Sequence, residues 1–208
     1  MRMPSNEFIP SLSRKINSHA GVDNQSMRNY FLKSAAAVFF AIAGLTACQP
    51  SLNWRAVQLE GTNLKLELPC KPDKTTQSVK MAGLDIDLSM VGCEANDAVW
   101  AVMTAQVPAT ADRVEILKGW RTATLQNMRA TQTQDLTWSP SRVAALPGTL
   151  RIKSVGTSAK GQPVHAQAVW FSHLEGEAVR LVHAVVYQNQ GPKMDSSAEQ
   201  LIESLKLP

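Results

Sequence analysis

Three cysteines hold the most reactive side chains in this chain of 208 residues. Cys48 ends an apolar run, whereas Cys70 and Cys93 lie in the stretch of alternating apolar and polar residues that follows. A thiol is a better nucleophile near neutral pH than a hydroxyl, because a useful fraction of it ionises. Cys48 is therefore a candidate for covalent modification, and Cys70 and Cys93 are an even pair that could form a disulfide bond.

The apolar run before Cys48 has the layout of a secretory signal. Arg28 and Lys33 form a short basic start, and mostly small apolar residues fill positions 34–47. This stretch is shorter than the roughly 20 apolar residues that cross a bilayer comfortably. A basic start, an apolar centre and small residues at the exit are typical of a signal peptide. We therefore expect residues 27–47 to be a signal peptide rather than a buried helix of the folded domain.

Residues 1–26 show no apolar period, and they precede a signal that is already complete. We expect translation to begin at Met27, so that residues 1–26 are a spurious N-terminal extension. The alternative is a genuine cytoplasmic extension in front of an internal signal.

The residues LTAC at 45–48 resemble the lipobox of bacterial lipoproteins. The resemblance implies that the thiol of Cys48 receives diacylglycerol, and that cleavage before Cys48 makes it the new N-terminus. An acyl anchor gains about 0.8 kcal/mol for each buried CH₂, so several chains on one cysteine hold a protein at a membrane. Gln49 stands where enteric lipoproteins retained in the inner membrane carry aspartate. We therefore expect a lipid anchor in the envelope of a Gram-negative bacterium, with the periplasmic face of the outer membrane favoured.

The surroundings of Cys70 and Cys93 predict two paired strands. Apolar and polar residues alternate over 64–68 and over 84–90, as in half-buried strands. A regular hairpin that turns near Ala82-Gly83 pairs residues whose numbers sum to about 165, which places position 93 opposite position 72. We therefore expect a Cys70–Cys93 disulfide in an exported chain. On the chain-entropy model, closing its loop should stabilise the fold by roughly 3 kcal/mol. The alternative, a redox or metal-binding pair, lacks the CxxC spacing that such pairs use.

The formal net charge of +4 belongs mostly to the leader. Residues 1–47 hold five basic and two acidic residues, and the rest of the chain holds 16 and 15. A nucleic-acid-binding face needs clustered Lys and Arg, so we expect no nucleic-acid partner. The partners that the sequence favours are a membrane, through the lipid anchor, and another protein of the envelope.

Behind a short tether at 48–53, residues 54–208 are expected to form one domain. Alternating or apolar runs predict strands at 54–59, 63–68, 75–81, 84–92, 97–107, 149–156, 163–173 and 178–188. The stretch 132–148 contains Pro140 and Pro147 and is expected to be a loop.

Two segments change to a helical period. Apolar residues three and four apart predict helices at 112–131 and 196–206. Asp112 with Glu115 has the spacing of a capping box at the start of the first helix. Ser196 with Glu199 has the same spacing at the start of the second.

This set of elements predicts an α+β fold, in which a mainly antiparallel sheet is covered by two helices. The order of the elements, which ends in "LIESLKLP", is similar to that of the PsbP-like and DcrB-like fold. The resemblance implies a small exported domain of a kind that mostly serves as a binding or assembly factor without catalysis.

Three histidines follow Cys48, at positions 165, 173 and 183. A hairpin that turns at Glu175-Gly176 pairs residues whose numbers sum to about 351. His183 would then face residue 168, and His165 would face residue 186. Because the imidazoles would not converge and show no ligand spacing, we expect no metal site.

Asp85 and Asp87 share one face of a predicted strand. Two such carboxylates could hold a cation or act as a general acid, but antiparallel sheets commonly leave one face wet, and we prefer that interpretation. No GxSxG, P-loop or GxGxxG motif occurs in the chain, and no spacing of Ser, His and Asp selects a triad. We therefore expect no catalytic residues and no cofactor.

Five tryptophans follow Cys48, where Phe171 and Tyr187 are the only other aromatic residues. Trp120 and Trp170 fit the apolar faces of predicted elements and are expected in the core. Trp138 lies in the Pro-containing segment "LTWSPSR", and loops carry function more often than the elements they connect. Trp138, with Arg142 nearby, is therefore the candidate surface contact.

The sequence as a whole favours a lipid-anchored, non-catalytic envelope lipoprotein that acts as a protein-binding or assembly module. The alternative is a periplasmic small-molecule carrier, with a pocket between sheet and helix that some of the tryptophans would line. An enzyme would need three or four polar groups that converge in one cleft, and no motif here predicts such a cleft.

Overall fold

The computed structural model describes residues 52–140, 146–158, 160–189 and 195–207. The expected signal peptide and the Cys48 anchor lie outside these ranges. Within them the chain forms nine strands and two helices. Neither of those helices is long and apolar enough to cross a membrane.

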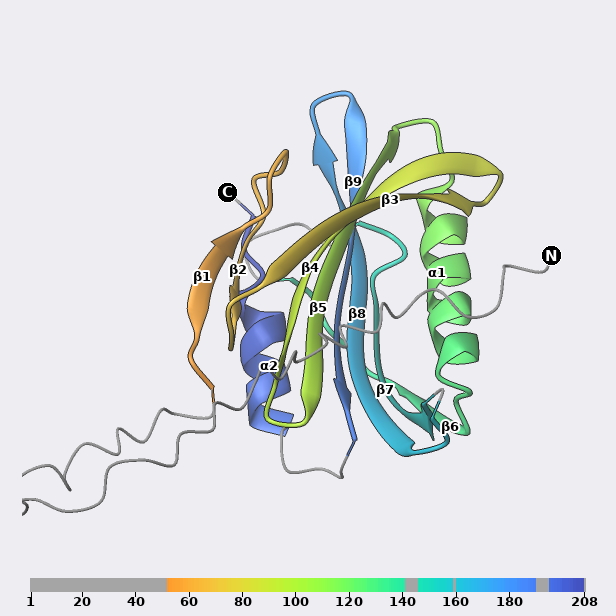
Figure 1. The fold of residues 1–208 in the computed structure, drawn as a ribbon. Helices are drawn as coiled ribbons and strands as arrows, with labels where there is room; N and C mark the ends of the chain where they lie inside the picture. Colours follow the sequence, from red (N-terminus) through yellow and green to blue (C-terminus); the bar gives the residue numbers. More distant parts are fainter. Residues whose placement is uncertain (1–51, 141–145, 159, 190–194, 208) are drawn as a thin grey trace, which may run out of the picture. The chain divides into compact units, whose positions relative to one another are not determined.

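Seven of the described strands form one sheet, in which every neighbouring pair is antiparallel (Figure 1). In spatial order they are β3 (Asp73–Met81), β4 (Leu84–Ala95), β5 (Ala98–Pro108), β9 (Ala178–Gln188), β8 (Pro163–Glu175), β7 (Leu150–Thr157) and β6 (Gln132–Asp135). The central strands β8 and β9 are buried on both faces over most of their length. The apolar runs in their sequences agree with this burial, because a strand covered on both faces can place apolar side chains on both.

Different elements cover the two faces of the sheet (Figure 1). The helix α1 (Arg113–Asn127) packs on one face, together with Trp170 of β8. The hairpin of β1 (Arg55–Gln58) and β2 (Lys65–Leu68) packs with the helix α2 (Asp195–Ser204) on the other, together with Phe171. We call these the α1 face and the α2 face. The expected α+β class, with a large antiparallel sheet and two helices, is confirmed.

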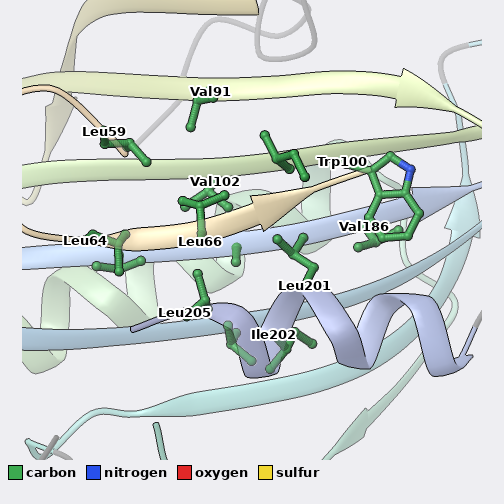
Figure 2. Close-up of a cluster of buried hydrophobic side chains, with 14 of the residues drawn as sticks. Leu59, Leu64, Leu66, Val91, Trp100, Val102, Val186, Leu201, Ile202 and Leu205 are labelled. Atoms are coloured by element: carbon green, nitrogen blue, oxygen red, sulfur yellow. The ribbon is translucent and has the colours of Figure 1, made fainter. Parts of the chain in front are cut away.

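Apolar side chains hold α2 against the sheet. Figure 2 shows Leu201 and Ile202 of α2, and Leu205 just after its end, lying with Leu66 of β2 and Val186 of β9 in one cluster. Each of these side chains is at most 2% exposed. Full burial of such a side chain stabilises the fold by about 1.5–3 kcal/mol, which is far more than a surface ion pair contributes. Burial of its apolar stripe therefore decides where α2 lies.

The start of α1 agrees with the sequence, but its end does not. The carboxylate of Asp112 accepts a hydrogen bond from the backbone N–H of Glu115 at 3.1 Å, which is the N-cap half of the expected capping box. The helix ends at Asn127 rather than at residue 131. Arg129 adopts a left-handed φ of 46°, which breaks the helical path and turns the chain toward β6.

The expected capping box of the second helix is wrong. α2 begins at Asp195, so Ser196 lies inside the helix rather than before it. The carboxylate of Glu199 pairs instead with the guanidinium of Arg151 on β7. Glu199 thus forms an ion pair with a distant strand instead of the capping interaction that its spacing from Ser196 predicted.

One strand was expected to be loop. Residues Gln132–Asp135 form β6, which pairs with β7 at the edge of the sheet. All four residues are exposed, so the segment lacks the apolar alternation by which a strand is recognised. Pairing of its backbone with β7, rather than burial of its side chains, makes it a strand.

One of the two expected hairpin registers is confirmed. Asp73 lies opposite Gly92, so partner numbers in β3 and β4 sum to 165 as expected. In β8 and β9 they sum to 353 rather than 351, because the turn is centred one residue later, on Gly176-Glu177. His183 therefore faces Trp170 rather than residue 168, and His165 faces Gln188 rather than residue 186.

Candidate functional site

The expected disulfide is present between Cys70 and Cys93, whose Cα atoms lie 6.0 Å apart. It ties the segment that follows β2 to β4. Cys93 is only 5% exposed and belongs to the apolar cluster of the α2 face. The bond therefore fastens the β1–β2 hairpin, which covers that face, to the sheet beneath it.

Trp138 is half-buried, and Arg142 lies outside the described residues. The Trp138 ring meets Phe171 edge-on, with the ring centroids 5.6 Å apart, and packs against the apolar cluster of the α2 face. Only part of the Trp138 side chain is thus free to meet a partner. A surface contact through Trp138 and Arg142 stays a prediction.

The three histidines lie apart, on two faces and at two ends of the sheet. His183 lies on the α1 face, whereas His165 and His173 lie on the α2 face, eight residues apart on β8. Among the described residues, no group of three or more His, Cys, Asp or Glu side chains could hold a metal ion. Asp85 and Asp87 are exposed, and Asp85 pairs with Lys80 at 3.2 Å.

His183 is a core residue. Its ring stacks on Trp170 at a centroid distance of 4.3 Å and meets Trp120 edge-on at 5.2 Å. Its Nδ1 lies 3.1 Å from the backbone oxygen of Val169. Complete burial lowers the pKa of His183 to about 3, and the contact with Val169 opposes this only in part. The imidazole is therefore neutral at physiological pH and serves packing rather than proton transfer.

A charged cluster lies near the turn between β8 and β9. The guanidinium of Arg180 donates to a carboxylate oxygen of Glu175 at 2.7 and 2.9 Å and to the backbone oxygen of Gly61 at 2.8 Å. His173 lies 3.5 Å from the other oxygen of Glu175, and burial lowers the pKa of His173. Because Arg180 reaches Gly61, the cluster ties the turn between β1 and β2 to the sheet. Its charges are paired, and we assign it a structural role.

A polar groove opens on the α2 face at the corner of the sheet formed by β6, β7, β8 and β9. Its volume is about 370 Å³. The described residues that line it are Gln132, Thr133, Gln134, Lys153, Ser154, Val155, His165, Ala166, Gln167 and Gln188. We call it the glutamine groove, because four of these ten residues are glutamines.

The floor of the glutamine groove consists of two rows of side chains that run across the strands. The first row, from β6 to β9, is Gln132, Val155, His165 and Gln188. The second row, in the same direction, is Gln134, Lys153, Gln167 and Val186. Residues opposite one another on one face of a sheet lie close together. The register thus gathers residues from 132 to 188 into one patch.

Burial deepens from the edge of the groove toward β9. Gln132 and Gln134 are exposed, His165 is half-buried, and Gln188 is 6% exposed. Within the described part of the chain, the Nε2 amide nitrogen of Gln188 has no hydrogen-bond partner. A buried polar group without a partner costs free energy, and such groups concentrate where a ligand or water can satisfy them.

The chemistry of the glutamine groove is hydrogen bonding. None of its described lining residues is Asp or Glu. The hydroxyl of Ser154 already donates to the backbone oxygen of Gln132 at 2.7 Å. The lining therefore offers donors and acceptors without a carboxylate to orient His165 as a base. These groups can bind a polar ligand through hydrogen bonds.

Sequence reasoning missed this site for a definite reason. Gln132 and Gln134 fell in a segment that we expected to be loop, and Gln188 marked only the end of a strand. The alternation Gln-Thr-Gln at 132–134 was the available signal, since it puts both amides on one face if the segment is a strand. His165 was considered only as a metal ligand.

No family model matches the chain, and no curated protein matches it. Among solved structures, it is similar to the crystal structure of PA94 from Pseudomonas aeruginosa, a protein of unknown function. The two are 11% identical, and the match covers 74% of this chain and 97% of PA94 with a TM-score of 0.30. A likeness of this extent assigns neither a function nor a finer fold family.

Proposed function

We propose that this chain is a lipid-anchored, non-catalytic lipoprotein of the Gram-negative cell envelope, whose domain acts as a protein-binding or assembly module. The Cys70–Cys93 disulfide carries the proposal. Such bonds persist in oxidising compartments and are rare in the cytosol. Together with the basic start, the apolar run and LTAC at 45–48, the disulfide favours export followed by acylation at Cys48.

The arrangement of polar groups supports binding over catalysis. The three histidines lie apart, and the charged cluster around Arg180 is internally paired. The glutamine groove contributes hydrogen-bonding groups without a carboxylate among its described residues. A binding module needs a shaped polar surface, whereas an enzyme needs an activated group beside it.

The finer fold assignment is also a proposal. We propose a PsbP-like fold on the order of the elements: a meander of β3, β4 and β5, then α1, the later hairpins and the terminal helix α2. That resemblance favours a binding or assembly role, although a fold alone does not transfer a function.

A small-molecule carrier is the second candidate, and one observation favours it. The glutamine groove, at about 370 Å³, has the size of a small ligand site. The expected pocket lined by tryptophans is not where such a ligand would bind, because Trp100 and Trp170 are fully buried and Trp120 is 4% exposed. A carrier would therefore use the polar corner of the sheet.

Intact mass of the full chain extracted from membranes, measured with and without reductant, tests the proposal. We expect a species that begins at Cys48, carries added acyl mass and gains about the mass of two protons on reduction. The variant Cys48→Ser is the matched control, and it should lose the acyl mass and leave the membrane fraction. An unacylated species that begins at Met1 would contradict the proposal.

A further inference from the structure

We infer that the glutamine groove binds a saccharide that carries acetamido groups, of the N-acetylhexosamine class found in envelope glycans. The inference deepens the proposed function, because an envelope location would bring the domain to such glycans. Its physical basis is the groove itself: amides in two cross-strand rows, a half-buried imidazole, and an apolar side chain between them.

Glutamine side chains match the hydrogen-bonding groups of an acetamido sugar. Each carries a carbonyl acceptor and an NH₂ donor side by side. An acetamido group presents one N–H and one C=O, and sugar hydroxyls both donate and accept. Gln132 and Gln134 reach such groups from the exposed edge, and Gln188 reaches them from the buried end. Rotation by half a turn about the last side-chain bond of Gln188 swaps the positions of its Oε1 and Nε2. Either atom can therefore face a ligand, the nitrogen as a donor and the oxygen as an acceptor.

The remaining lining residues favour this sugar over an extended peptide. Val155 lies between Gln132 and His165 in the first row and is half-buried. It offers an acetyl methyl group an apolar contact of matching size. A peptide would need pockets for alternate side chains, and Val155 is the one apolar side chain that the described lining residues present on the α2 face, because Ala166 packs in the cluster of the α1 face.

The size of the groove agrees with a short segment, and Lys153 is the one lysine or arginine among its described lining residues. A volume of about 370 Å³ lies near the lower end of the range for ligand pockets, which suits one or two sugar rings rather than a long polymer. The described lining contains no carboxylate, so nothing there would select a cationic ligand. Arg151, two residues before Lys153 on β7, is paired with Glu199 of α2 and is not among the lining residues of the groove.

Titration of the isotope-labelled full chain in detergent micelles, followed by NMR, tests the inference. The probe is N,N′-diacetylchitobiose, and the resonances are the glutamine NH₂ groups and the histidine ring protons. We expect saturable shifts at Gln134, Gln188 and His165, while the buried His183 stays unmoved. Cellobiose, which lacks the acetamido groups, should bind about tenfold more weakly, because it forfeits a hydrogen-bonded amide pair.

Matched variants make the assignment specific. Gln134→Ala removes an exposed amide with little risk to the fold, and we expect it to weaken probe binding about fivefold. Gln77→Ala removes an exposed glutamine on β3, outside the groove, and should change nothing. Absence of saturable shifts in the folded chain, equal binding of cellobiose, or equal affinity in Gln134→Ala would overturn the inference. So would an extended peptide that shifts the groove resonances while the sugar does not.

The two tests fail independently. An unacylated chain would refute the envelope anchor and leave any measured sugar affinity intact. A chain without sugar affinity would refute the saccharide site and leave the anchor intact.

Discussion

The two faces of the sheet use the same strands for opposite purposes. On the α1 face, Ala166, Ala168 and Trp170 of β8 lie in an apolar cluster with α1 and are almost completely buried. On the α2 face, the interleaved residues His165 and Gln167 line the glutamine groove. Alternation of side chains along one strand thus builds a closed core and an open polar site back to back.

The two faces also differ in how their polar side chains are enclosed. On the α1 face, the buried His183 is enclosed by two tryptophans and contacts a backbone oxygen. In the glutamine groove, Gln188 is buried with an amide nitrogen that has no partner among the described residues. Among the described residues the indole nitrogen of Trp170, on the α1 face, also lacks a partner, so the openness of the groove rather than the missing partner distinguishes the two faces.

The largest effect on stability is expected from Trp170→Ala on the α1 face. Trp170 is fully buried and stacked on His183, so its removal leaves a large cavity and should lower the free energy of unfolding by about 3–5 kcal/mol. Urea denaturation measures this loss. The half-buried Trp138 on the other face is the matched control, and Trp138→Ala should cost less than half as much. Equal costs would show that the two faces do not differ as described.

Removal of the disulfide should act mainly on the covered part of the α2 face. The double variant Cys70→Ser, Cys93→Ser opens a loop with a sequence separation of 23 and should cost about 3 kcal/mol. Hydrogen exchange should rise most in the β1–β2 hairpin and least in α1, because the bond fastens only the hairpin side. Exchange that rises first in α1 would contradict this assignment. Cys48→Ser is the control and should leave unfolding unchanged.

Acid should lower the stability of the fold through His183, which is buried on the α1 face. Its pKa is about 3 in the folded chain, against an ordinary value near 6.5 in the unfolded chain. Below pH 6.5 His183 therefore binds a proton in the unfolded state but not in the folded state. The free energy of unfolding falls as the pH drops from 6.5 toward 3. We expect a loss of about 2 kcal/mol by pH 5.

Unfolding midpoints measured between pH 4 and 8 check this prediction. His183→Phe should flatten the decline, whereas Gln77→Ala, at an exposed position on β3, should leave it unchanged. The buried His173, whose pKa is also lowered, adds a decline of the same sign that both variants retain. An equal slope in wild type and His183→Phe would overturn the role given to His183.

The smallest effect on stability is expected in the glutamine groove. Gln188→Leu removes the amide whose nitrogen has no partner among the described residues, and it should change the unfolding free energy by no more than about 1 kcal/mol, in either direction. Thermal denaturation would show this. A loss of about 3 kcal/mol would mean that Gln188 is a structural core residue and would remove the contrast between the faces.

Much of the fold could be predicted because its signals are local. The strands around Leu66 and Leu88 showed in their alternation, and Asp112 marked the start of α1 by its spacing to Glu115. The Cys70–Cys93 bond followed from one turn position and the regularity of a hairpin. Each of these signals spans about two dozen residues or fewer.

The prediction failed where a distant partner decides the structure. β6 is a strand because β7 pairs with it, and its exposed residues carry no apolar pattern. Glu199 was free to cap α2 by local spacing, but Arg151 of β7 binds it instead. The register of β8 and β9 differed by two because the hairpin turn lies one residue further along than the Glu-Gly pair suggested.

Residues close together in the chain were enough to predict an export signal and a lipobox, and to place most of the strands and the pairing of the two later cysteines. Only the tertiary structure decided the glutamine groove. Its rows join Gln132 to Gln188 across four strands, and each added strand requires its own register. Since a shift of one residue turns a side chain to the opposite face, no local pattern could specify which amides meet.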